Sequence, residues 1–301
     1  MTLTRPSPCK VNLLLNILGK RADGFHELET VMQPVALCDE LTFESAGRGV
    51  ALTCSDPALP TDESNLVHRA ASAFLARSAM SGGVRIHLEK KIPMAAGLGG
   101  GSGNAATTLL ALNELFGAPL RRETLHEIAA SLGSDIPFFL QGNPALATGR
   151  GEKIESLAPF AALEGGALLL VHPGFGIATA WAYRELARFP SALNGERGRA
   201  AKLIADLQAG DLKRAGAGFY NSLEAPALDK YPWLAVLQDF LRENGAAAVL
   251  MSGSGSTTFA IARDVCGAQE LEERVKEKFG RCWTAVVPVG APVIVASNQV
   301  G

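Results

Sequence analysis

One glycine-rich stretch restricts how this chain can fold. Five of the seven residues from Gly97 to Gly103 are glycine, and a predicted helix at residues 104–116 follows directly. Glycine allows positive φ and a close approach to a ligand, so successive N–H groups can converge on phosphate oxygens. The helix adds the positive end of its dipole. The alternative, a flexible turn, would lose backbone entropy for no evident folding reason. We therefore predict a phosphate-binding loop.

Other glycine-loop chemistries fit this stretch less well. A Walker A loop ends in Gly-Lys-Ser/Thr, and the turn contains no lysine. The dinucleotide pattern Gly-x-Gly-x-x-Gly fails because Ser102 occupies its third glycine position. We expect the Ser102 hydroxyl to bind phosphate or Mg²⁺, and Asn104 to cap the helix and touch the ligand. The residues predicted to form this binding loop are Pro93, Met94, Ala95, Ala96, Gly97, Leu98, Gly99, Gly100, Gly101, Ser102, Gly103 and Asn104.

Composition argues against several kinds of partner. The net charge of −2 leaves no basic field to attract nucleic acid. The five cysteines are odd in number and include no CxxC pair, so neither a disulfide framework nor a zinc site is indicated. The N-terminus lacks an apolar signal core, and no apolar run approaches the ~20 residues of a membrane-spanning helix. We expect a soluble cytoplasmic protein without nucleic acid or membrane partners.

The spacing of apolar residues predicts an α+β chain of two domains. A stretch without a strong period, residues 155–166, separates two mixtures of helices and short strands. We place the domains at residues 1–157 and 158–301. The predicted strands are residues 11–17, 31–37, 40–44, 50–54, 84–89, 145–148, 167–172, 247–251, 257–261, 283–287 and 293–296. The predicted helices are residues 64–80, 104–116, 122–131, 179–188, 199–209, 233–243 and 268–279.

Five blocks of sequence resemble the GHMP kinase superfamily and, within it, the 4-diphosphocytidyl-2-C-methyl-D-erythritol kinase family. The glycine turn indicates only the superfamily. Gly-Phe-His-Glu at residues 24–27 and Asp-Ile-Pro-Phe-Phe at residues 135–139 together select the family. The blocks occur in order at residues 8–13, 21–28, 97–107, 134–139 and 251–257.

The resemblance implies a fold and a reaction. The fold is a ribosomal-S5-like N-terminal domain and a ferredoxin-like C-terminal domain, with the site in the cleft between them. In the reaction, ATP with Mg²⁺ phosphorylates the 2-hydroxyl of 4-diphosphocytidyl-2-C-methyl-D-erythritol, a precursor in the non-mevalonate isoprenoid route. The implied partner is this small cytidyl diphosphate molecule. A monomer and a homodimer both stay open.

The resemblance also gives roles to two charged residues. Asp135 corresponds to the catalytic base for the substrate hydroxyl, and Lys10 to an ammonium that steadies this carboxylate and the transferring phosphoryl oxygens. Taken alone, each residue has a second interpretation. Asp135 can cap a helix that begins near Pro137, and Lys10 can be a solvated lysine at the start of a strand.

Three residues near the N-terminus are expected to bind the substrate. Asn12 is two residues after Lys10, so its side chain leaves the strand on the same face and can bond the polyol. Phe25 and His26 match the cytosine-binding block of the family. An aromatic face stacks on a pyrimidine, and an imidazole can hydrogen-bond its polar edge.

The remaining site residues come from the second half of the chain. A block at residues 172–183 resembles the second aromatic wall, which gives Tyr183 a place opposite Phe25 and Thr179 a place near the diphosphate or polyol. Phe175 is the alternative wall. A second glycine turn at residues 253–256 is expected to support the phosphate loop. Ser102 and Thr107 are both candidates for the hydroxyl that meets Mg²⁺.

Other functions account for fewer of these residues. Another kinase of the superfamily, acting on homoserine, mevalonate or a sugar, would keep the glycine turn and need no nucleobase pocket. A binding module without catalysis would not need both Lys10 and Asp135. A nicotinamide dehydrogenase fits least, because the dinucleotide pattern is broken.

Overall fold

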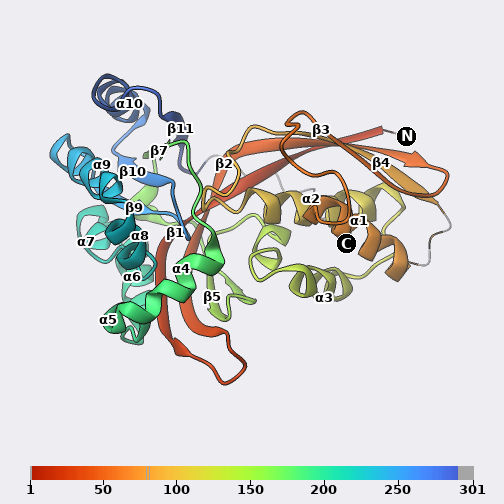
Figure 1. Cartoon of the computed structure of the whole chain (residues 1–301), viewed down its shortest axis with the longest axis horizontal. Helices are drawn as coiled ribbons and strands as arrows, with labels where there is room; N and C mark the ends of the chain where they lie inside the picture. The colour runs from red at the N-terminus through yellow and green to blue at the C-terminus, as the bar shows by residue number, and fades with distance from the viewer. Residues whose placement is uncertain (1, 79, 81, 291–301) are drawn as a thin grey trace.

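A long antiparallel ribbon of two strands forms the spine of the molecule (Figure 1). The computed structural model describes residues 2–78, 80 and 82–290. Strand β1 (Thr2–Lys20) pairs with β2 (His26–Ala46) along almost its whole length. Residues 7–17 of β1 are buried without alternation, so both faces of this strand are covered by other parts of the chain.

The other elements are shorter. The remaining strands are β3 (Gly49–Cys54), β4 (Gly83–Glu89), β5 (Ala145–Gly149), β6 (Lys153–Ser156), β7 (Ala167–His172), β8 (Tyr220–Asn221), β9 (Ala248–Met251), β10 (Thr258–Ala262) and β11 (Trp283–Pro288). The α-helices are α1 (Leu66–Ser78), α2 (Gly100–Leu115), α3 (Arg122–Leu132), α4 (Thr179–Glu185), α5 (Pro190–Leu193), α6 (Arg199–Gln208), α7 (Leu212–Ala217), α8 (Glu224–Lys230), α9 (Pro232–Glu243) and α10 (Val265–Phe279). Short 3-10 helices are η1 (Pro137–Leu140), η2 (Ala161–Leu163) and η3 (Leu186–Arg188).

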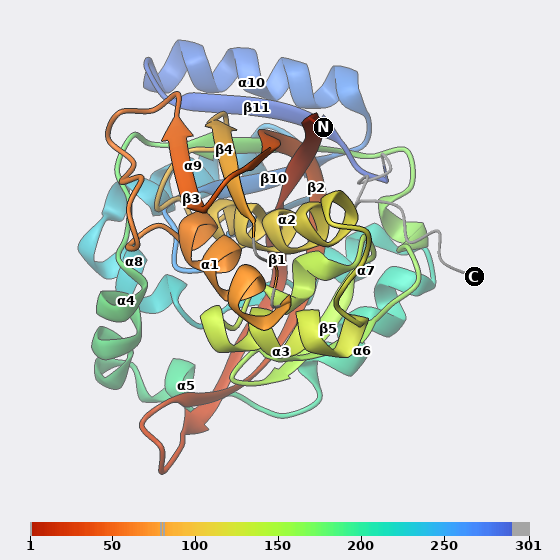
Figure 2. The same ribbon diagram turned by 90° about the vertical axis from the view of Figure 1, so that its right-hand side faces the viewer.

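The first sheet is built around the β1–β2 ribbon. Its strand order is β3-β4-β2-β1-β8, and β5 pairs with the opposite half of β2 and with β6. Helices α1 and α2 lie against this sheet, and α3 packs on these two helices (Figure 2). The apolar core between them includes Phe43, Phe74, Leu112 and Phe138, all fully buried. This packing fixes the start of α2 against the middle of β1.

The second sheet has the order β11-β7-β10-β9, with every pair antiparallel. Its chain order, with helices between β7 and β9 and α10 between β10 and β11, is the βαββαβ pattern of ferredoxin-like folds. Helices α9 and α10 pack on one face, through residues such as Leu237 and Val275. The other face packs against Val11, Leu13 and Leu98, so the second sheet is seated on β1 and on the glycine turn.

Most predicted elements are present, but several boundaries were wrong. The predicted break between residues 37 and 40 does not exist, because β2 continues past a register shift opposite Pro8 and Cys9. Helix α2 begins at Gly100, four residues before the predicted start. Helices α5, α7 and α8 and strands β6 and β8 were not predicted. The predicted strand at residues 293–296 lies outside the described residues.

Strand β8 links the two halves of the sequence. Strand β8 belongs to the second half of the sequence but pairs in parallel with β1 at Leu14 and Leu15. The division at residues 157 and 158 stays a prediction. Across the described ranges, no helix combines the length and apolar character required to cross a bilayer.

A buried carboxylate ties the glycine turn to β2. Asp39 is fully buried and lies 2.8 Å from the Lys90 ammonium. It also accepts backbone N–H bonds from Lys91 (2.7 Å) and Ile92 (2.8 Å), and a side-chain bond from Asn104 (3.0 Å). These bonds satisfy the charge away from water, as a buried ion pair requires. They hold the segment that leads into the glycine turn.

Removing this carboxylate should destabilise the fold strongly. Asp39→Ala leaves the Lys90 ammonium and two N–H groups without their acceptor, so we expect a loss of about 3–5 kcal/mol in the free energy of unfolding. Urea denaturation measures it. The matched control is Glu44→Ala, which removes the partner of exposed Arg85 and should change stability by less than about 1 kcal/mol. Equal effects of the two substitutions would contradict this role for Asp39.

Candidate active site

The glycine turn presents a row of free backbone N–H groups. Gly97 (φ 77°) and Gly99 (φ 69°) adopt the left-handed conformation, and Gly99 is the residue that precedes the first turn of α2. No described residue accepts a hydrogen bond from the backbone N–H groups of residues 97–102. Three of them, Gly100, Gly101 and Ser102, form the first turn of a helix, where N–H groups have no partner inside the helix. Such an arrangement binds anions.

Close packing explains why several positions in this turn are glycine. A Cβ atom on Gly97 would lie 2.0 Å from the carbonyl oxygen of Ser252, and one on Gly103 would lie 2.4 Å from that of Pro8. Gly101 differs, because the nearest atom to its Cβ would be a Leu66 methyl carbon at 3.7 Å. Gly97 and Gly103 are therefore required by close packing within the protein, whereas no protein atom requires a glycine at position 101.

Asn104 has a different task from the predicted one. It does not cap α2, since the helix already begins at Gly100. Its side-chain amide donates to the Ser7 hydroxyl and to Asp39, both at 3.0 Å. The N–H groups of a glycine-rich first turn stay available without a capping side chain, so the predicted cap was wrong. Asn104 supports the loop from behind.

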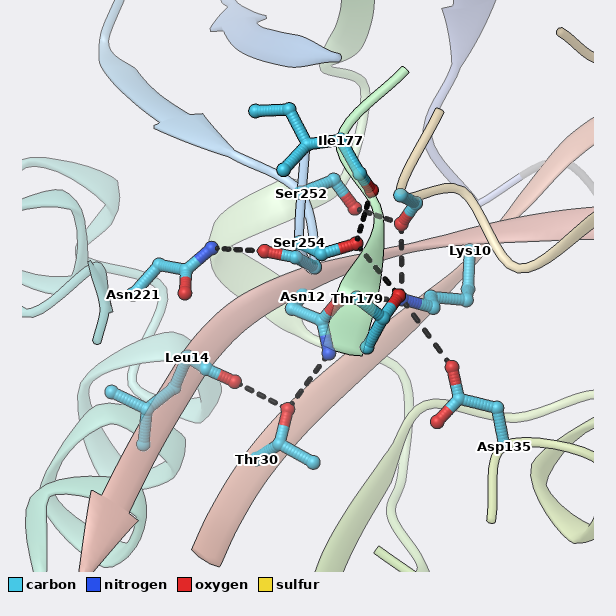
Figure 3. Close-up of polar contacts among 12 residues, drawn as sticks. Lys10, Asn12, Leu14, Thr30, Asp135, Ile177, Thr179, Asn221, Ser252 and Ser254 are labelled. Atoms are coloured by element: carbon cyan, nitrogen blue, oxygen red, sulfur yellow. Dashed lines mark hydrogen bonds and ion pairs between the residues drawn. The ribbon is translucent and has the colours of Figure 1, made fainter. Parts of the chain in front are cut away.

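Lys10 is buried at the junction of three chain segments. Its side chain is 4% exposed, so the alternative of a solvated lysine is excluded. The ammonium donates to Asn12 Oδ1 at 2.6 Å and to the Gly97 carbonyl at 3.1 Å, and lies 3.7 Å from Asp135 Oδ2 (Figure 3). Its backbone N–H donates to Leu98 O at 2.9 Å. The structure thus brings together three of the predicted site regions.

Asp135 projects toward Lys10 rather than capping a helix. The residue that precedes η1 is Ile136, and no side chain caps this 3-10 helix. The Asp135 side chain is about half exposed (44%), with Lys10 as its cationic partner. The alternative role as a helix cap is therefore wrong. A carboxylate that faces the cleft beside an ammonium is suited to accept a proton from a bound hydroxyl.

Asn12 is oriented by its neighbours on the ribbon. Its amide nitrogen donates to the Thr30 hydroxyl at 2.9 Å, and Thr30 in turn donates to the Leu14 carbonyl (Figure 3). The register of β1 against β2 shifts between Asn12 and Leu14. Such bulges re-aim side chains next to active sites. Thr30 was not among the predicted residues, because a threonine in a strand carries no distinguishing sequence signal.

The second glycine turn supports the first one. The Ser252 hydroxyl donates to the Gly97 carbonyl at 3.0 Å, and the Thr257 N–H donates to Ala96 O at 3.2 Å. Ser254 faces Thr179, with 3.0 Å between the two hydroxyl oxygens (Figure 3). The loop and this turn are therefore bonded to each other across the cleft.

A buried asparagine that sequence reasoning missed holds this second turn in place. The Asn221 amide nitrogen donates to the carbonyl oxygens of Met251 and Gly253, both at 2.8 Å. Its own oxygen accepts the Leu223 N–H at 2.9 Å. Glu224 accepts the Met251 N–H at 2.8 Å, and burial raises the pKa of this carboxyl group. Asn221 lies in a two-residue strand, which is too short to be seen from periodicity.

Aromatic side chains gather at the other end of the cleft. His26 and Tyr183 lie with ring centroids 5.0 Å apart, and Phe25 is 52% exposed at the tip of the β1–β2 hairpin. Phe175 packs instead on Tyr231, at 4.8 Å, and does not line the cleft. Burial, followed by the charge of Lys20, lowers the pKa of His26. Burial, and then the nearby Asp135 carboxylate, raises the pKa of Tyr183 above its ordinary range.

One cleft of about 1350 Å³ connects these groups. The glycine turn, the Lys10–Asp135 pair and the Phe25–His26 end all line it, as do Thr179 and Tyr183. This volume exceeds the 300–1000 Å³ typical of a pocket for a single drug-sized ligand. The arrangement can hold two molecules, one with phosphates on the turn and one with a hydroxyl at Asp135.

Known proteins match both halves of the chain. The pattern of the GHMP kinases N terminal domain matches residues 65–143, and that of the GHMP kinases C terminal domain matches residues 203–281. The 4-diphosphocytidyl-2-C-methyl-D-erythritol kinase of Pelotomaculum thermopropionicum is 41% identical over 277 residues, covering 92% of this chain and 94% of the relative. The chain belongs to this kinase family.

Solved structures of kinases share the fold. A crystal structure of 4-(cytidine 5'-diphospho)-2C-methyl-D-erythritol kinase superposes with a TM-score of 0.80 at 36% identity, covering 96% of this chain and all of that one. A homoserine kinase from Cytophaga hutchinsonii, at 21% identity and a TM-score of 0.76, covers 96% of this chain and 95% of its own length. This second likeness concerns the fold alone. The predicted two-domain GHMP kinase fold is confirmed.

The two kinds of glycine in the turn should respond differently to a methyl group. For Gly101→Ala we expect weaker ATP binding. The stability should be unchanged or slightly higher, because the Cβ clashes with nothing in the protein and alanine favours a helix by up to ~1 kcal/mol. For Gly97→Ala we expect a loss of stability of about 1–3 kcal/mol, since the clash adds to a left-handed backbone.

Calorimetric titration with ATP and urea unfolding separate the two effects. Gly245, which has open space around its Cβ and lies far from the turn in sequence, supplies the control variant Gly245→Asn, since asparagine tolerates its φ of 94° better than most residues. Unimpaired ATP binding by Gly101→Ala would show that phosphates do not pack on this part of the turn.

Proposed function

We propose that this kinase transfers the γ-phosphoryl group of ATP to the 2-hydroxyl of 4-diphosphocytidyl-2-C-methyl-D-erythritol, in the non-mevalonate route to isoprenoid precursors. The observation that carries the proposal is the Lys10–Asp135 pair, 3.7 Å apart and facing the same cleft as the free N–H groups of the glycine turn. The chain is 41% identical to a member of this kinase family, which supports the choice of substrate.

The residues of the turn fit the polyphosphate of ATP. The unpartnered N–H groups of Gly100, Gly101 and Ser102 supply donors, and the α2 dipole supplies a partial positive charge. Gly101 leaves room for a phosphate to approach the backbone. Residues 93–104 would therefore hold the nucleotide, with Asn104 acting through the buried bonds described above.

The side chains near the turn are also compatible with Mg²⁺ that is bound mainly to the phosphates of ATP. The described residues contain no cluster of three or more His, Cys, Asp or Glu side chains that could hold a metal ion alone. Magnesium in kinases is bound largely through phosphate oxygens and water, and it neutralises charge that develops during transfer. Ser102 lines the cleft and Thr107 does not, which makes Ser102 the better candidate for a protein ligand.

Asp135 and Lys10 divide the chemical work. Asp135 accepts the proton of the substrate hydroxyl as its oxygen attacks the γ-phosphorus and ADP leaves. A carboxylate can serve as the base because the transition state is loose and needs little early ionisation of the nucleophile. Lys10 donates toward Asp135 and toward the oxygens of the transferring group, and its two fixed bonds to Asn12 and Gly97 prevent it from moving.

The opposite end of the cleft suits a pyrimidine. Phe25 presents an exposed aromatic face, and burial of His26 lowers its pKa, which favours the neutral imidazole. A neutral imidazole donates from one nitrogen and accepts at the other, which matches the mixed donor and acceptor edge of cytosine. Tyr183 packs beside His26, and Asn12 and Thr179 would bond the polyol or diphosphate. We place the reaction in the cytoplasm, with the enzyme acting as a monomer or homodimer.

Replacing the proposed base should stop chemistry and spare binding. Asp135→Asn keeps the shape of the side chain and removes its ability to take a proton, so we expect kcat to fall by roughly 10²–10⁴-fold. The Kd for ATP, measured by calorimetry, should change less than about threefold. Glu127→Gln serves as a control, since this exposed carboxylate is paired with Arg77 and does not line the cleft. A variant with kcat near the wild-type value would remove Asp135 from the mechanism.

A comparison of acceptor alcohols tests the substrate. ADP release, coupled to a spectrophotometric readout, should be fast with the cytidyl substrate and at background with mevalonate and homoserine. The reason is that only the first can occupy both the aromatic end and the Lys10–Asp135 centre. If mevalonate or homoserine is turned over and the cytidyl compound is not, the protein is a kinase of this fold with another substrate.

A further inference from the structure

The turn between β5 and β6 carries a cation that the reaction described above does not use. The guanidinium carbon of Arg150 lies 4.6 Å from the centre of the Phe25 ring, and both residues line the cleft. Strand β5 pairs with β2 so that Gly149 stands opposite Leu28. This register brings the Arg150 turn beside the hairpin tip that presents Phe25.

The conformation of this turn fixes the position of Arg150. Gly149 (φ 73°) and Gly151 (φ 103°) flank it, and its backbone N–H donates to Glu152 Oε2 at 2.6 Å. A Cβ on Gly151 would lie 3.7 Å from Ser134 Cβ, so the turn also rests against the residue before Asp135. One turn therefore contacts the aromatic end of the cleft through Arg150 and the catalytic segment through Gly151.

Arg150 keeps much of its charge available. Its closest carboxylate is Glu152, with 4.0 Å between Nε and Oε2, and no described residue accepts a hydrogen bond from the guanidinium. The acidic groups at the hairpin tip, Asp23 and Glu27, are both paired with Arg21. A planar guanidinium can lie on a ring face while its in-plane N–H groups bind oxygen atoms.

Three of the four other cations of the cleft are already engaged; the fourth, Lys20, stands opposite His26 on the hairpin. Lys10 is bonded to Asn12 and Gly97, Lys90 is paired with Asp39, and Arg184 lies 3.5 Å from Glu185. Arg150 is thus well placed, and free enough, to meet a doubly charged group in the substrate half of the cleft.

We propose that Arg150 binds the diphosphate of the cytidyl substrate while its guanidinium covers one face of Phe25 and leaves the other face for the pyrimidine. This inference rests on the proposed function. A substrate that reaches from Phe25 to Asp135 passes the turn that touches both ends, and its diphosphate lies between its base and its alcohol. Charge-assisted bonds from arginine to phosphate are strong and geometrically specific. Arg150 is therefore a residue that selects a nucleoside diphosphate over a simple alcohol.

The test compares two ligands that differ only in the diphosphate. Calorimetric titration of the full-length protein with cytidine diphosphate should give a Kd that rises roughly tenfold to hundredfold in Arg150→Ala. The Kd for cytidine should rise less than about threefold, and KM for ATP should not change. Arg150→Lys should recover part of the loss and Arg150→Gln should not. The control is Arg85→Ala, an exposed arginine that also faces a carboxylate.

The outcomes separate this inference from the function on which it rests. An unchanged Kd for cytidine diphosphate in Arg150→Ala, or an equal loss for cytidine and cytidine diphosphate, would overturn the role in diphosphate binding. Failure of the wild-type protein to bind cytidine diphosphate at all would overturn the proposed function and the inference together.

Discussion

A lysine ammonium taken out of water is the constraint around which this molecule is organised. Lys10 donates two hydrogen bonds, to Asn12 on the same strand and to the Gly97 carbonyl, and its charge faces Asp135 at 3.7 Å. The Gly97 carbonyl also accepts from Ser252. A single peptide oxygen therefore couples the first strand, the glycine turn and the second glycine turn.

The two sheets make this meeting possible. Strand β1 of the first sheet carries Lys10 and Asn12. The glycine turn that leads into α2 lies against these two residues. The second sheet sits on the same strand through a shared apolar cluster that contains Val11, Leu98 and Phe259. Because apolar packing joins the two halves directly beneath the polar groups, the distances in the site are set by the rigid interior of the protein rather than by loops.

The sequence predicted the elements well and the local geometry less well. Periodicity located β7 to the residue, and the glycine run and its resemblance located the loop. Glycine's poor helix propensity concealed that α2 starts inside the run, and packing of α2 on β1 overrides that propensity. Asp39 and Asn221 could not be predicted, because their importance arises from partners 50 or more and 30 residues away along the chain. Arg150 reaches Phe25 only through the pairing of β5 with β2.

The pairing of β1 with β2, which follows it directly, and with β8, about 200 residues later, has a consequence for synthesis. Lys10 leaves the ribosome first, while Asn221 and Gly253 follow more than 200 residues later. At about 5–20 residues per second, this interval is on the order of ten to fifty seconds. During it the edge of β1 that later receives β8 has no partner of its own, and an unpaired strand edge invites pairing with other chains. The edge of β1 at Leu14 and Leu15 is therefore covered only after residues 220 and 221 have been synthesised.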